Sequence, residues 1–227
     1  DEEDIFSLTE GLYKRILKEI KGIDLPTPFP RMTHAEAMAK YNSDKPDIRK
    51  DKTNKDEFAF LWVVNFPMFK HNKEENRWES EHHPFTSMKE EDAHLLDQGG
   101  DLSKIRSLAY DLVLNGNEIG SGSVRIHKKD MQKKIFDIIG FTEEEAQRRF
   151  GFLLRAFEYG APPHAGVAYG IDRLTAILCG MDTIRDTIAF PKTQKGTCLV
   201  TDAPSAVDKK QLQELGIMTV TKGAKNV

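Results

Sequence analysis

The stretch that decides the fold is AYDLVLNGNEIGSGSVRIH, residues 109–127. Two apolar segments, Ser107–Leu114 and Glu118–His127, surround Asn115-Gly116, the strongest short-range signal for a β-hairpin. Antiparallel hairpins with helices in separate parts of the chain are typical of the α+β class. The sequence therefore predicts an antiparallel β-sheet flanked by helices.

The hairpin register places acidic side chains near one another. With Asn115 and Gly116 in the turn, Asp111 is expected opposite Gly120 and diagonal to Glu118, with Cβ atoms about 7 Å apart or less. Two carboxylates at that spacing can bind one hard divalent cation beside bound phosphates. The alternative is a pair of solvated carboxylates, since antiparallel sheets often have one wet face.

Arg125 lies an odd number of positions after Glu118, which puts the two side chains on opposite faces of an ideal strand. A β-bulge within residues 120–122 would bring them to one face. Arginine in a pocket binds a carboxylate or phosphate through two hydrogen bonds. The alternative is an ordinary surface arginine.

The rest of the chain supplies one buried strand and several helices. The apolar run Phe58–Phe69 is typical of a strand buried on both faces, and Pro67 is expected to end it. Capping boxes at Thr33/Glu36 and Thr142/Glu145 mark two helix starts. The predicted helices are 4–21, 33–41, 90–96, 129–139, 143–159 and 171–178; 165–169 is a short strand, 70–81 a hairpin or loop, and 43–57 a charged loop.

The pair His82-His83 before Pro84 is the first candidate outside the hairpin. No cysteine or histidine lies nearby at metal-site spacing, so the sequence predicts no zinc. We expect the histidines to orient a small ligand; the alternative is an exposed pair without a role.

Gly170-Ile171-Asp172-Arg173 opens the helix 171–178. Asp172 suits a helix N-terminus, and its simplest role is a cap. Arg173 opposes the helix dipole there, and residues that break a local rule are often functional. Backbone N–H groups and a guanidinium together form a good polyphosphate site.

Composition narrows the class of protein. The 227 residues carry a net charge of −3, which gives no bulk attraction to nucleic acid. Two cysteines are too few for a disulfide framework, no apolar run approaches a membrane span, and the acidic first residues do not resemble a signal peptide. No Rossmann or P-loop glycine motif occurs. The chain does not begin with an initiator Met, and we expect further sequence upstream of it.

Several segments in this order resemble the aspartyl branch of the class II aminoacyl-tRNA synthetases, in its bacterial form. They are SDKPD (43–47), FLWVVNFPMF (60–69), HHPFTS (82–87), the hairpin 109–127, GFLLRAFEYGAPPHAG (151–166), AYGIDRL (168–174) and AFPKTQ (189–194). The segment 166–178 resembles the third signature motif of that class. The resemblance covers the C-terminal part of the catalytic domain.

The resemblance implies a reaction: aspartate and ATP form aspartyl-adenylate, and the aspartyl group then passes to tRNA(Asp). It also implies Mg²⁺ as the cofactor with ATP, a homodimeric parent enzyme and a cytoplasmic location. The implied site residues are His82, His83 and Arg125 for aspartate; Glu118, Gly170, Ile171, Asp172 and Arg173 for ATP; Asp111 and Glu118 for Mg²⁺; and Glu118, Arg125 and Arg173 as catalytic.

The chain also departs from the family pattern. The anticodon-binding barrel and the first two class motifs have no counterpart here, so we expect the 227 residues alone to be inactive. Bacterial members carry an inserted domain between SDKPD and FLWVV. We therefore divide the chain into 1–49 and 50–227. We expect either that the inserted domain is deleted between residues 49 and 50 or that these two residues flank an omitted segment.

Three other interpretations stay open at this point. One is a related ligase for asparagine or lysine, or an aspartate–ammonia ligase. Another is a non-catalytic fragment or paralogue that only binds ligand, and the last is a structural domain. The resemblance does not distinguish charging of tRNA(Asp) alone from charging of tRNA(Asn) as well.

Overall fold

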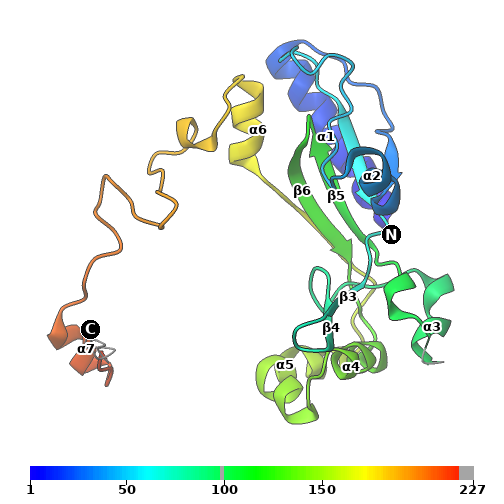
Figure 1. The fold of residues 1–227 in the computed structure, drawn as a ribbon, viewed down its shortest axis with the longest axis vertical. Helices are drawn as coiled ribbons and strands as arrows, with labels where there is room; N and C mark the ends of the chain where they lie inside the picture. The colour runs from blue at the N-terminus through cyan, green and yellow to red at the C-terminus, as the bar shows by residue number, and fades with distance from the viewer. Residues whose placement is uncertain (98–99, 220–227) are drawn as a thin grey trace. The chain divides into compact units, whose positions relative to one another are not determined.

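The computed structural model describes residues 1–97 and 100–219, which fall into two compact units divided between Leu174 and Thr175. The first unit contains a five-stranded sheet in the order β1-β2-β5-β6-β7, with every pairing antiparallel except the parallel pair β1–β2 (Figure 1). Its strands are β1 (Arg31–Thr33), β2 (Phe60–Val64), β5 (Ala109–Leu114), β6 (Asn117–Val124) and β7 (Ala165–Tyr169). The predicted α+β sheet flanked by helices is confirmed.

Helices α1 (Glu2–Lys21) and α2 (His34–Tyr41) cover the sheet. Phe6 of α1 packs on Trp62 with ring centroids 4.3 Å apart, and on Tyr110 at 5.1 Å. The next residue of β2, Val63, points to the opposite face of the sheet. There it lies in one apolar cluster with Ala37 of α2 and with other residues of β2 and β5. Strand β2 is therefore buried on both faces, as its continuous apolar run predicts.

A second apolar cluster packs beside the sheet. It joins the hairpin of β3 (Phe69–Asn72) and β4 (Arg77–Ser80) to α4 (Lys129–Ile138) and α5 (Glu143–Glu158). Thr142 and Glu145 form the predicted capping box at the start of α5, because each side chain accepts a hydrogen bond from the backbone N–H of the other residue. Short helices η1 (Glu90–Asp92), α3 (His94–Asp97) and η2 (Leu102–Lys104) lie in the connection to β5.

The remaining elements are α6 (Ile171–Leu178), at the boundary of the two units, and η3 (Ile184–Asp186) and α7 (Lys209–Glu214) in the second. Among the described residues, no helix is both long and apolar enough to cross a membrane.

Several predicted boundaries were wrong. Helix α1 begins at Glu2, because Asp1 caps it through a capping box with Asp4. Strand β2 ends at Val64 rather than at Pro67, since Asn65 adopts a positive φ of 56° that breaks the extended backbone. Strand β1, which the sequence did not predict, forms by parallel pairing with β2 rather than by its own propensity.

Candidate active site

The β5–β6 hairpin turns at Asn115-Gly116 as predicted, and Val113 pairs with Glu118. The register then shifts, because Leu112 pairs with Gly120 and leaves Ile119 without a partner. The predicted bulge therefore exists, one residue before the expected position at 120–122. It follows that Glu118 and Ser121 share one face of β6, together with Ser123 and Arg125.

The bulge also corrects the expected position of Asp111. It lies opposite Ser121 rather than Gly120, on the same face as Glu118. Its side chain is buried, with 4% of its surface exposed, so it is not the solvated carboxylate of the alternative interpretation. Burial raises the pKa of Asp111, and the nearby Glu118 carboxylate raises it further, while contact with Ser121 and the charge of His82 oppose the shift.

Atom Oδ1 of Asp111 is buried without a hydrogen-bond partner. A buried carboxylate oxygen left unpartnered is costly, and its position beside a second carboxylate fits a bound divalent cation. No group of three or more histidine, cysteine or acidic side chains suited to a metal occurs among residues 1–97 and 100–219. Asp111 and Glu118 alone would therefore hold the ion, which suits Mg²⁺, because it keeps waters and phosphates as its other ligands.

Arg173, at the start of α6, approaches Glu118 directly. Its Nη1 donates to the carbonyl oxygen of Glu118 at 2.7 Å and lies 3.8 Å from Oε1 of the same residue. The adjacent Gly170 N–H donates to the Ile119 carbonyl at 2.8 Å. The start of α6 is thus fixed against the bulge of β6, with half of the Arg173 side chain exposed to solvent.

The loop after α2 contributes a residue that the sequence reasoning missed. Lys45, inside SDKPD, places its Nζ 3.1 Å from Oε2 of Glu118. Hydrogen bonding to Glu118 raises the pKa of Lys45. The sequence assigns no role to this lysine, because its place in an aperiodic loop does not predict where the side chain points.

An imidazole and a guanidinium meet at the other end of this face. Arg125 places Nη1 3.1 Å from Nδ1 of His83 and also contacts Nε2 of the ring. The Phe85 N–H donates to the same Nδ1 at 3.2 Å. Burial lowers the pKa of His83 to about 4, with the charges of Arg125 and His82 adding to the effect, so the ring is neutral at neutral pH.

Arg125 is itself held in place by the backbone. Its N–H donates to the His164 carbonyl at 2.9 Å, and the residue forms an isolated bridge with Thr86. Burial lowers the pKa of Arg125, although not enough to discharge a guanidinium. His82 stays exposed, with its ring 4.9 Å from that of Phe66.

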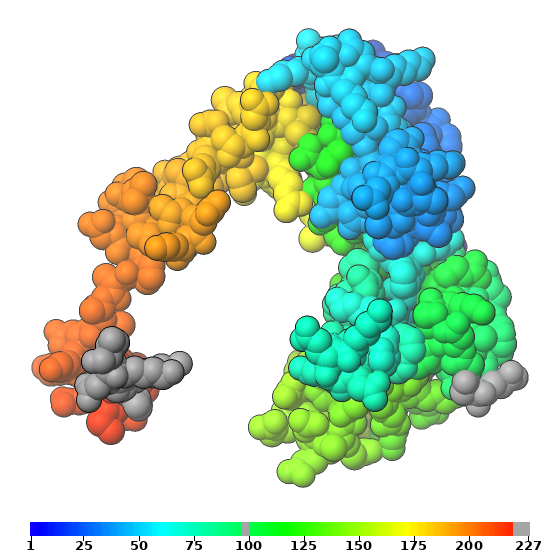
Figure 2. Space-filling view, in the orientation of Figure 1, coloured from blue at the N-terminus to red at the C-terminus, as the bar shows by residue number. Residues whose placement is uncertain are grey.

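Direct contacts join Arg173 to Glu118 at one end of this face and Arg125 to His83 at the other. Asp111 lies on the same face of the β5–β6 hairpin as Glu118. Figure 2 shows part of β5–β6 (green) left visible beside the blue and cyan surface of α2 and the loop after it.

Two predicted ATP residues lie at the exposed start of α6. Ile171 is 62% exposed, and Asp172 is exposed as well.

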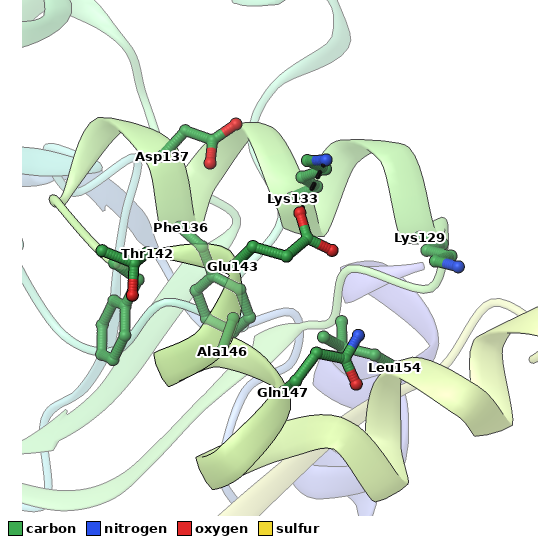
Figure 3. A pocket seen from close by; sticks show the side chains of 10 residues that line it. Lys129, Lys133, Phe136, Asp137, Thr142, Glu143, Ala146, Gln147 and Leu154 are labelled. Carbon is green, nitrogen blue, oxygen red and sulfur yellow. Dashed lines mark ion pairs between the residues drawn. The ribbon is translucent and has the colours of Figure 1, made fainter.

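Two cavities lie away from the carboxylates. The one between α4 and α5 measures about 30 Å³ and is closed over by the Lys133–Glu143 ion pair at 2.9 Å (Figure 3). It holds no more than about one water molecule. A larger one, of about 330 Å³, lies beside His82 and His83 and has an aromatic floor that includes Phe141 and Phe150.

Comparison with known proteins gives consistent matches. The family described as class II tRNA synthetases (D, K and N) matches residues 1–194. The aspartate–tRNA(Asp/Asn) ligase of Dictyoglomus turgidum is 36% identical over 340 residues, covering 96% of this chain and 57% of that protein. The enzyme of the same name from Caldanaerobacter subterraneus is 58% identical over 160 residues, covering 70% of this chain and 27% of the relative.

Solved structures agree on the fold. An aspartyl-tRNA synthetase from Entamoeba histolytica superposes with a TM-score of 0.60 at 20% identity, over 86% of this chain and 41% of that one. An asparaginyl-tRNA synthetase from the same organism gives 0.54 at 20% identity, over 86% and 43%. The matched region thus spans 57% of the Dictyoglomus protein and less than half of each of the other three.

Proposed function

The chain belongs to the class II tRNA synthetases for aspartate, lysine and asparagine, and we propose that it carries part of the active site of an aspartate–tRNA ligase. The reaction is activation of L-aspartate by ATP to aspartyl-adenylate and pyrophosphate, followed by transfer of the aspartyl group to tRNA(Asp). The names of the relatives, which are aspartate–tRNA ligases, support aspartate over the other two amino acids.

One observation carries the proposal: the bulge at Ile119 puts Glu118 and Arg125 on one face of β6. Glu118 then belongs to the nucleotide end, with Arg173, and Arg125 to the amino-acid end, with His83. An aminoacyl-adenylate has the same two ends, a charged side chain and a nucleotide, joined by an acyl phosphate.

In this proposal Arg125 binds the side-chain carboxylate of aspartate, and His82 and His83 shape the pocket around it. Neutral His83 accepts hydrogen bonds and adds no competing charge. An asparagine amide would present N–H donors to a guanidinium that has only donors, and such a mismatch can discriminate by roughly 10⁴ or more.

At the nucleotide end, Arg173 would lie against the triphosphate, and the backbone of 170–172 would line the ATP site. Asp111 and Glu118 would hold Mg²⁺, which neutralises phosphate charge when it is bound. Attack of the aspartate carboxylate on the α-phosphate needs little acid–base help, so the contribution of these residues is alignment and charge stabilisation.

The alignment with the Dictyoglomus enzyme supports the proposed division of the chain. It extends over 340 residues, although this chain has only 227, so the relative contains long segments without a counterpart here. An insertion between 1–49 and 50–227 would account for this. The parent protein would act in the cytoplasm as a homodimer with tRNA as its partner.

Calorimetry with non-hydrolysable adenylate analogues tests the proposal. We expect aspartyl-sulfamoyl-adenosine to bind the chain at least about a hundredfold more tightly than the asparaginyl or lysyl analogue. Arg125→Gln should remove most of this preference, whereas Arg155→Gln, on the exposed face of α5, should not. Equal binding of the three analogues by a folded chain would refute aspartate as the substrate.

A further inference from the structure

Lys45 is held at the candidate metal site by a loop with its own fixed structure. Its N–H donates to Ser43 Oγ at 3.0 Å, and Pro46 next to it is buried. Asp47 pairs with Arg49 at 2.7 Å and packs against the hairpin turn at Gly116, where an added Cβ would lie 3.3 Å from that of Asp47. The loop is thus seated on the β5–β6 turn, and the Lys45 side chain extends from it toward Glu118.

Glu118 has cationic partners, whereas a buried oxygen of the neighbouring Asp111 has none. Its Oε2 is 3.1 Å from Lys45 Nζ, and its Oε1 is 3.8 Å from Arg173 Nη1, so each oxygen has a cation beside it. Asp111, on the same face, has a buried oxygen with no partner at all. A divalent cation shared by both carboxylates would partner that oxygen, and it would compete with Lys45 for Glu118.

Lys45 is suited to exchange. Its side chain is 40% exposed, and ion pairs that open to solvent are weak enough to be replaced by a stronger cation. An ammonium on a flexible stem can turn within the site without moving the loop backbone. The neighbouring ligand would be a polyphosphate, whose oxygens bind an ammonium as well as a carboxylate does.

We propose that Lys45 is a positioning residue that occupies the carboxylate site as a tethered cation and passes to a nucleotide phosphate when a divalent cation binds Asp111 and Glu118. This inference rests on the proposed function and adds a residue to it. Lys45 holds Glu118 in place before the ligands arrive, and it supplies an additional positive charge to the triphosphate afterwards.

The proposal predicts effects of opposite sign for one substitution. In Lys45→Met, Mn²⁺ alone, followed by the EPR signal of the free ion, should bind about two- to fivefold more tightly, because its competitor is gone. The Mn²⁺ complex of a non-hydrolysable ATP analogue, followed by calorimetry, should bind about tenfold more weakly, because a phosphate contact is lost.

Two further variants separate this role from general effects of charge and folding. Lys52→Met removes an exposed lysine of the same segment and should change neither affinity by more than about twofold. Lys45→Arg keeps a cation and should restore nucleotide binding to near the wild-type value. Thermal unfolding should show that all three variants fold.

The outcomes are distinct. Weaker binding of Mn²⁺ alone in Lys45→Met, or unchanged nucleotide binding, would overturn the inference. If the wild-type chain bound Mn²⁺ but no nucleotide, the proposed function would fail together with the phosphate step, while the Mn²⁺ titration would still decide the competition for Glu118.

Discussion

Arg173 and Glu118, 55 residues apart in the chain, are joined twice: one guanidinium nitrogen donates to the Glu118 carbonyl and also approaches its carboxylate. The carbonyl contact fixes where the arginine sits, and the carboxylate contact leaves part of the guanidinium facing solvent. A functional group that is anchored through the backbone of its neighbour is positioned before any ligand arrives.

The first prediction concerns that arginine. Arg173→Gln should lower the affinity for the Mn²⁺ complex of a non-hydrolysable ATP analogue by about ten- to a hundredfold, since a charge-assisted contact to the triphosphate is lost. Stability should change little, because the side chain is 52% exposed. Calorimetry and thermal unfolding check the two parts; an affinity equal to that of wild type would remove Arg173 from the site.

Asp111→Asn should separate stability from ligand binding. The raised pKa of Asp111 means that the folded state disfavours its charge, so its ionisation costs stability as pH rises from the ordinary carboxyl range through the folded pKa. The amide removes that cost, and we expect a higher Tm at neutral pH together with loss of Mn²⁺ binding. A lower Tm with unchanged Mn²⁺ affinity would contradict the assignment.

His83 should make the fold sensitive to acid. Its pKa is about 4 in the folded chain, against 6.5 ordinarily, so the unfolded chain binds more protons between those values. Stability from this group is therefore complete above pH 6.5 and is lost as pH falls toward 4. The free energy of unfolding in urea should depend less steeply on pH in His83→Gln than in wild type across this range. Parallel curves for the two proteins would show that His83 does not contribute to the pH dependence.

A matched pair of glycines tests the β6–β7 contact. A Cβ on Gly122 would lie 2.0 Å from the Gly166 carbonyl oxygen and 2.6 Å from the Tyr110 ring, whereas one on Gly166 would meet nothing within 4 Å. Gly122→Ala should cost about 3 kcal/mol or more, because strand and ring must move apart. Gly166→Ala should lie within about 1 kcal/mol of wild type. Equal unfolding midpoints of the two variants in urea would show that β6 and β7 accommodate a methyl group at Gly122.

The last prediction concerns activity of the chain by itself. Aspartate-dependent ATP–pyrophosphate exchange should be undetectable, since the family resemblance implies a second class motif that the sequence of these residues does not show. Analogue binding should nevertheless persist, because Arg125, Glu118 and Arg173 are already placed. Measurable exchange by the purified chain would refute the prediction.

Local signals in the sequence predicted much of this fold. The turn Asn115-Gly116 and the capping box at Thr142 were reliable because each depends on neighbouring residues only. Strand β1 was missed because its pairing with β2 is tertiary. The bulge was predicted because the family resemblance implies Glu118 and Arg125 in one pocket, although their spacing puts them on opposite faces of an ideal strand. Its place at Ile119 depends on packing, since that side chain is fully buried.

The site was predicted less completely than the fold. Asp111 and Glu118 could be grouped by strand periodicity, whereas the approach of Arg173 depends on how α6 docks against β6. Lys45 was missed because an aperiodic loop gives no rule for where a lysine will point.

The unpaired Ile119 makes the length of the segment between Glu118 and Arg125 critical during evolution. Substitution within 118–125 alters one side chain, but gain or loss of a single codon there would rotate Glu118 and Arg125 to opposite sides of the strand. We expect lineages that retain activity to vary in composition along residues 118–125 while the length of this segment stays constant.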